Sequence, residues 1–106
     1  MNDHVEVTTT TETRDDARRI AHALVESRLA ACVQIRGPIE SHYRWRGEIE
    51  TAEEWQCVAK TRRTLFGEVE QAIRNVHPYD VPEILAVEIV EESHAYAKWL
   101  DEQVGS

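Results

Sequence analysis

The sequence has few cysteines and no long apolar run. Its 106 residues include only Cys32 and Cys57, and no CxxC, HxxxH or HxH pattern occurs. We therefore expect no tight transition-metal site within one chain. No stretch approaches the ~20 apolar residues that a membrane span needs. The first residues form neither a basic leader nor an apolar segment, so we expect a cytoplasmic protein without a signal peptide.

Catalytic motifs are also missing. The four glycines form no phosphate-binding loop, and the sequence contains neither a nucleophile elbow nor an assembled Ser/His/Asp set. We therefore expect a binding protein and not an enzyme.

Positive charge is scarce as well. Twelve Lys and Arg oppose twenty Asp and Glu, which gives a net charge of −8. Proteins bind nucleic acid largely by neutralising phosphates, so this balance argues against such a partner. Cations are the more natural guests, although a solvated acidic surface explains the same charge.

Residue patterns predict alternating strands and helices in a single domain, residues 1–106. The β-branched residues 5–11 predict a strand. Thr13, followed by Asp16, predicts an N-cap and a helix start. Apolar residues then recur at helical spacing. These residues are Ala17, Ile20, Ala21, Leu24, Val25 and Leu29.

The middle of the chain predicts a long β-hairpin. Residues 31–43 and 48–61 are strand-like, with Arg46-Gly47 as a two-residue turn and an interruption at Gly37-Pro38 that suits a bulge or an edge. In this register Cys32 lies opposite Thr61 and Cys57 opposite Arg36. The two thiols are then roughly 13 Å apart, whereas a disulfide tolerates only about 7 Å between Cα atoms.

The last third predicts a helix over residues 64–76, a strand over 83–90, and a final helix capped by Ser93. The resulting order, βαββαβ plus a C-terminal helix, is that of an α+β fold with a ferredoxin-like antiparallel sheet.

The hairpin is too long for a monomer. Each arm has about fifteen residues and spans roughly 50 Å, whereas a domain of this size is only about 35 Å across. The tip, with Tyr43, Trp45 and Ile49, must therefore project beyond its own core. An exposed aromatic ribbon aggregates unless another chain covers it, so we expect a homo-oligomer.

A rigid turn follows the second predicted helix. Pro78 and Pro82 restrict the backbone on either side of Tyr79 and Asp80, with His77 just before them. A constrained polar turn of this kind is either a site or a packing device.

With these elements in place, the chain resembles the CutA family of divalent-cation tolerance proteins. The resemblance implies a ferredoxin-like subunit, a homotrimer, a cytoplasmic location, a role in metal tolerance, and copper binding in some members. It covers nearly the whole chain in one order. The segments that carry it are residues 29–33, 41–47, 60–61 and 77–84, together with Tyr96, Trp99 and Leu100.

His77 is a candidate metal ligand, with Glu83 or Asp80 supplying oxygen, and it is the one residue that matches the copper-binding members. Copper-binding members place a cysteine and a further histidine where this chain has Thr9 and Val76. Both are strong copper ligands, so we expect at most weak binding of Cu²⁺ or another divalent cation, with no cofactor required. Alternatively, His77 caps the carbonyl groups at the end of the second helix.

A second candidate set is aromatic. In a trimer, these residues could line a cleft between subunits, or they could simply be buried at the interface, where Tyr and Trp are enriched. The set comprises Tyr43, Trp45, Lys60, Tyr79 and Trp99.

Two functional hypotheses follow. The first is a trimeric protein of metal homeostasis that binds divalent cations weakly, with no nucleic-acid or membrane partner. The alternative is a small-molecule sensor similar to the PII signalling proteins, or a protein-interaction scaffold, using the clefts between subunits.

Overall fold

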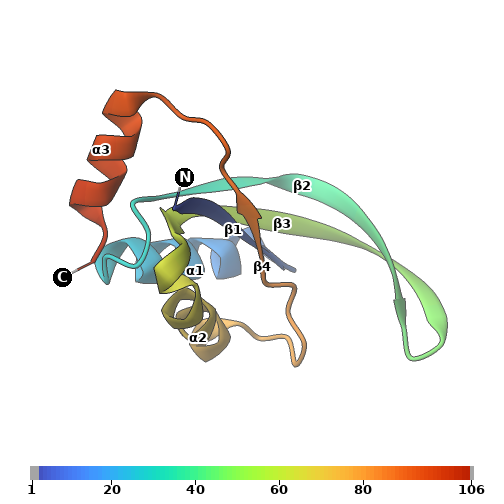
Figure 1. Cartoon of the computed structure of the whole chain (residues 1–106). Coiled ribbons are helices and arrows are strands. Elements are labelled where there is room, and N and C mark those ends of the chain that lie inside the picture. Colours follow the sequence, from blue (N-terminus) through green and yellow to red (C-terminus); the bar gives the residue numbers. More distant parts are fainter. Residues whose placement is uncertain (1–2, 106) are drawn as a thin grey trace.

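The computed structural model describes residues 3–105, and strands and helices follow one another in the predicted order (Figure 1). The strands are β1 (His4–Thr11), β2 (Cys32–Trp45), β3 (Glu48–Arg62) and β4 (Leu85–Glu88). The helices are α1 (Arg14–Glu26), α2 (Phe66–Val76), which follows the short 3-10 turn η1 (Arg63–Leu65), and α3 (His94–Gln103). No helix in the described part of the chain is long and apolar enough to cross a membrane.

The four strands form one antiparallel sheet in the order β2-β3-β1-β4. Figure 1 shows α1 and α2 on one face of this sheet, whereas α3 lies apart from them, near the end where β1 begins. The protein is therefore an α+β fold, and its strand order is compatible with the predicted ferredoxin-like plan.

The core lies between the sheet and its two covering helices. Alternate residues of β1, Val5 and Val7, are buried, as are Ala17, Ile20 and Leu24 along one face of α1. Periods of two in the strand and three to four in the helix place these side chains against one another. The rest of the cluster is Ala30, Cys57, Ala59, Val69 and Ile73.

Both predicted helix caps are present. The Thr13 hydroxyl accepts the backbone N–H of Asp16 at 3.1 Å, and the Ser93 hydroxyl accepts that of Tyr96 at 3.1 Å. Each bond satisfies an N–H group that has no partner inside its helix. The caps fix where α1 and α3 begin.

Two sequence predictions extended too far: the core stripe of the first helix and the last strand. Val25 is exposed rather than part of the core stripe, because it lies about 100° around the helix from buried Leu24. The strand predicted for residues 83–90 is only Leu85–Glu88. Pairing with β1 begins only at Leu85, three residues after Pro82.

The turn of the hairpin forms as predicted. Trp45 pairs with Glu48, and the two residues between them have positive φ angles, 52° at Arg46 and 82° at Gly47. This is the backbone of a two-residue turn whose twist matches that of the flanking strands.

The bulge at Gly37-Pro38 also forms, and it shifts the register by one residue. Arg36 pairs with Gln56 and Ile39 with Glu54, so Gly37 and Pro38 together lie opposite a single residue of β3. The pairing predicted for the cysteines was therefore wrong by one position, because it assumed an unbroken ladder.

The cysteines nevertheless remain apart. Cys32 pairs with Lys60 and Cys57 with Ile35, which leaves three strand residues, roughly 10 Å, between the thiols. Both are free, and burial raises the pKa of the Cys57 thiol to about 11. Cys57 is therefore a small core residue and not a nucleophile.

Gly37 is required by its neighbour Trp55, which gives a testable prediction. A Cβ atom at position 37 would lie 2.5 Å from the Trp55 ring. We expect Gly37→Ala to lower the free energy of unfolding by about 1–3 kcal/mol, measured by urea denaturation. The control is Gly67→Ala in α2, where a Cβ meets nothing within 4 Å. We expect this control to be neutral or slightly stabilising, and equal losses in both variants would refute the steric argument.

The hairpin projects beyond the rest of the molecule, as its length predicts. The principal extents are 44 × 25 × 22 Å, and Figure 1 shows the far ends of β2 and β3 extending past the helices. At the tip Tyr43 is 45% exposed, Trp45 42% and Ile49 72%. A single chain therefore leaves an aromatic surface uncovered.

Candidate functional site: a cavity between the hairpin and the turn after α2

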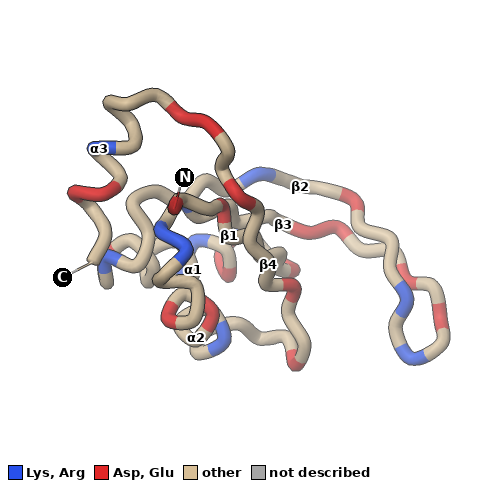
Figure 2. Tube along the Cα trace, viewed as in Figure 1, with Lys and Arg blue, Asp and Glu red and all other residues tan. Residues whose placement is uncertain are grey.

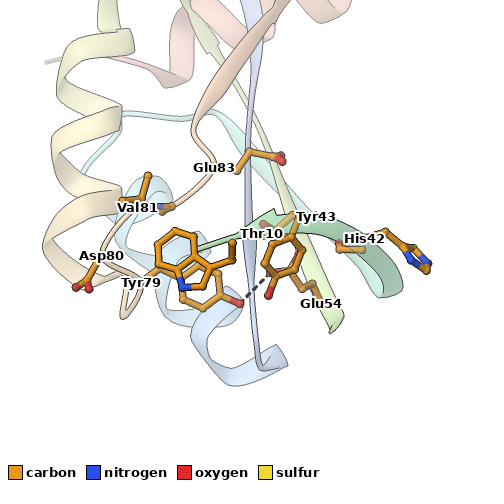
Figure 3. Close-up of a pocket in the computed structure, with 11 residues that line it drawn as sticks. Thr10, His42, Tyr43, Glu54, Tyr79, Asp80, Val81 and Glu83 are labelled. Atoms are coloured by element: carbon orange, nitrogen blue, oxygen red, sulfur yellow. Dashed lines mark hydrogen bonds between the residues drawn. The ribbon is translucent and has the colours of Figure 1, made fainter. Parts of the chain in front are cut away.

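The candidate site is a cavity of about 620 Å³ between the projecting hairpin and the turn that joins α2 to β4 (Figure 3). Three strands and the turn contribute to its wall. Because Pro78 and Pro82 stiffen the turn, its polar side chains are held against the sheet. The lining residues are Thr10, Ser41, His42, Tyr43, Trp45, Glu54, Tyr79, Asp80, Val81, Pro82 and Glu83.

A hydrogen bond across the cavity joins the turn to the hairpin. The Tyr79 hydroxyl donates to Glu54 Oε2 at 2.8 Å, drawn as a dashed line in Figure 3. Glu54 is only 7% exposed. Burial, and then the Glu54 carboxylate, raise the pKa of Tyr79 far above its usual value, so the phenol stays protonated and donates.

The His77 ring holds the turn in place through two hydrogen bonds. The backbone N–H of Tyr79 donates to His77 Nδ1 at 3.1 Å, so Nε2 carries the proton and donates to the Thr10 carbonyl at 2.8 Å. The ring is buried and lies 4.7 Å from that of Tyr79. The alternative interpretation, in which the His77 side chain caps the carbonyl groups of α2, is therefore wrong. Only the backbone N–H of His77 bonds to the end of the helix, at the carbonyl of Ile73.

The three predicted metal ligands do not meet at one point. A metal at His77 would have to displace one of its two hydrogen bonds. In Figure 3 the carboxylates of Asp80 and Glu83 point in different directions. Within residues 3–105, no group of three or more His, Cys, Asp or Glu side chains is placed to hold a metal ion.

The five residues of the aromatic set do not all lie together. Tyr43, Trp45 and Tyr79 line the cavity together. Lys60 lies elsewhere on the sheet, where its ammonium donates to Gln34 Oε1 at 2.6 Å. Trp99 is on α3, with its ring 5.5 Å from that of Tyr96. Three of the five residues are thus neighbours within one chain, and the cleft between subunits stays a prediction.

Six lining residues were not among the sequence candidates: Thr10, Ser41, His42, Glu54, Val81 and Pro82. Glu54 follows another glutamate in an acidic strand, and nothing in its spacing singles it out. Its partner Tyr79 is 25 residues away. The predicted two-residue turn already pairs Glu54 with Ile39, but that pairing does not show that Glu54 contacts Tyr79.

The surroundings of the cavity are acidic. Figure 2 shows Asp and Glu along the hairpin and on the segment before β4, and Lys or Arg at the hairpin tip. The lining residues themselves include three carboxylates and no Lys or Arg. The cavity therefore suits a positively charged guest and disfavours an anion.

Comparison with known proteins identifies the family. The model of the CutA1 divalent ion tolerance proteins matches residues 5–103. A divalent-cation tolerance protein CutA from Thermus thermophilus is 43% identical over 96 residues, covering 91% of this chain and 93% of its own.

Solved structures agree over the same length. A divalent cation tolerance protein (Cut A1) of Thermus thermophilus superposes with a TM-score of 0.93 at 41% identity, covering 96% of this chain and 99% of its own. A CutA from Xylella fastidiosa superposes with a TM-score of 0.94 at 32% identity, covering 98% and 100%. The chain therefore belongs to the family of CutA1 divalent ion tolerance proteins.

Proposed function

We propose that this protein acts in divalent-cation tolerance as a homotrimer, without enzymatic activity, and that it binds divalent cations weakly. The observation that carries the assembly is the projecting hairpin. Tyr43, Trp45 and Ile49 expose large apolar side chains at its tip, and an isolated soluble domain rarely leaves such a ribbon uncovered. Neighbouring copies of the same chain supply the cover.

The sheet edges support the same proposal. In the order β2-β3-β1-β4, the outer strands β2 and β4 each leave one side without a partner strand in a single chain. β4 also exposes Leu85 and Val87. Unpaired edges that carry apolar side chains favour pairing with another copy.

For the cation, we propose a site of oxygen ligands shared between copies. Asp80 and Glu83 are exposed carboxylates on the turn beside the hairpin, and they point away from one another. Each is free to join carboxylates of a neighbouring chain. Sites of this type hold divalent cations weakly, because their carboxylate ligands are not joined by a cysteine thiolate.

Titration calorimetry with CuCl₂, ZnCl₂ and MnCl₂ tests the metal proposal. We expect weak, saturable binding that falls by about tenfold or more in Asp80→Asn/Glu83→Gln, because both charged ligands are lost. The control Asp15→Asn/Glu26→Gln makes the same charge change on the exposed surface of α1 and should bind as the wild type does. If the metal titrations release no binding heat and the protein does not compete with a weak chelator, the proposal of metal binding is refuted.

We also propose that the protein is located in the cytoplasm. The two free thiols, held apart by the hairpin register, are consistent with that reducing compartment.

A further inference from the structure

We propose that the cavity between the hairpin and the turn binds a small organic cation, with an ammonium or guanidinium head and a short apolar body. This proposal goes beyond metal tolerance, because the guest is not a metal ion. Every lining residue comes from one chain, so the proposal does not depend on a shared metal site; in the proposed assembly, the copy that covers Tyr43 and Trp45 forms a further wall of the same cavity.

The size and the walls of the cavity fit such a guest. Its volume of about 620 Å³ is within the range of small-molecule sites. Three aromatic rings, those of Tyr43, Trp45 and Tyr79, line it, and the faces of aromatic rings attract cations. The Arg46 guanidinium already lies 5.5 Å from the centroid of the Trp45 ring, so this ring accommodates a cation on one face.

Glu54 supplies the negative charge that attracts the organic cation. Its carboxylate is more than nine-tenths buried, and its hydrogen bond from Tyr79 comes from a neutral phenol, which orients the group without balancing its charge. A carboxylate offers about four acceptor positions, so capacity remains for the N–H groups of a guest. Burying a charge is costly unless a countercharge accompanies it, and an organic cation supplies one.

The apolar part of the guest has its own contacts. Val81 and Pro82 contribute to the same wall as the aromatic rings. A hydrated metal ion makes no use of such surface, whereas a short alkyl chain removes it from water. The mixture of a buried carboxylate, aromatic faces and aliphatic surface therefore favours an organic ammonium ion over a bare cation.

The test is a nuclear magnetic resonance titration of the full-length protein with n-butylammonium chloride, and with 1-butanol as its uncharged counterpart. We expect saturable amide shifts at residues 41–45, 54 and 79–83 with butylammonium, at a dissociation constant on the order of millimolar. We expect no saturation with 1-butanol. Glu54→Gln should weaken butylammonium binding by about tenfold or more, because it removes the charge and keeps the shape.

The matched control is Glu53→Gln, the same change one residue along β3, where the side chain is exposed and does not line the cavity. It should keep the wild-type affinity within about twofold. Equal losses in the two variants, equal binding of 1-butanol, or no saturable shift at all would each overturn the proposal. If Glu54→Gln does not fold, the wild-type comparison of butylammonium with 1-butanol decides alone. Failure of the metal titration above leaves this result unaffected.

Discussion

A triple variant carrying Tyr43→Ser, Trp45→Ser and Ile49→Ser is expected to sediment as a monomer near 12.2 kDa, the mass of one chain. The three side chains are 45%, 42% and 72% exposed in a single chain, so burying them requires a neighbour. Large anchors at the centre of an interface typically contribute about 2 kcal/mol or more each, so removing three lowers the association constant by roughly ten-thousandfold or more.

The control for this variant is Val25→Ser/Val76→Ser, which removes exposed apolar side chains from α1 and α2. It should keep the mass of the wild-type assembly. Far-UV circular dichroism should show that the tip variant retains its strands and helices, because its substitutions lie outside the core. A tip variant that keeps the wild-type mass would show that the hairpin tip does not hold the assembly together.

His4→Leu is expected to lower the free energy of unfolding by about 3 kcal/mol near pH 5.5, measured by urea denaturation. This is the largest loss of stability among the variants considered. The buried imidazole bonds to Glu92 Oε2 at 2.6 Å through Nδ1 and to Asp101 Oδ1 at 2.9 Å through Nε2. These bonds tie the start of β1 to α3 and to the segment before it. Removing the imidazole leaves the Glu92 carboxylate, which is only 10% exposed, without this partner.

The pH dependence of the His4 contribution has a definite sign. Burial lowers the pKa of His4, but hydrogen bonds to Asp101 and Glu92 and their charges outweigh burial, so the pKa is raised above 6.5. The stabilisation is therefore complete below pH 6.5 and is lost as the pH rises through the folded value. Hydrogen bonds from His4 and Arg62 lower the pKa of Asp101 below 3.8, so its contribution is lost only as the pH falls through that lower value.

The difference in unfolding free energy between the wild type and His4→Leu should consequently be largest between about pH 4 and 6.5, and should shrink toward pH 9. His22→Leu serves as the control. His22 pairs with Glu26 on the exposed surface of α1 at 3.6 Å, and its loss should change stability by no more than about 0.5 kcal/mol. A pH-independent difference for His4→Leu would contradict the charged pairing.

Local signals in the sequence predicted most of the fold. The caps at Thr13 and Ser93, the turn at Arg46-Gly47 and the bulge at Gly37-Pro38 all depend on residues within a few positions of one another. Such features follow from backbone preferences and short-range hydrogen bonds, and each is present in the structure.

Long-range packing could not be predicted in the same way. An interruption at Gly37-Pro38 was expected, but the sequence did not determine the register beyond it, where Arg36 pairs with Gln56. The one-residue shift changes which residues of β3 lie opposite residues 32–36 of β2. The short length of β4 likewise depends on where the turn rejoins β1.

The site was predicted in part for the same reason. Tyr43, Trp45 and Tyr79 stood out as aromatic residues near turns, and they do line one cavity. Glu54 did not, because its role depends on a hydrogen bond to a residue 25 positions away. His77 was singled out correctly as a constrained residue, but its ring supports the turn through Thr10 and the Tyr79 N–H.

Sedimentation equilibrium of the unmodified protein at low micromolar concentration tests the proposed assembly most directly. We expect one species at three times the 12.2 kDa of the chain, persisting on dilution because neighbouring copies cover the hairpin tip. A single species at 12.2 kDa across that concentration range would contradict it.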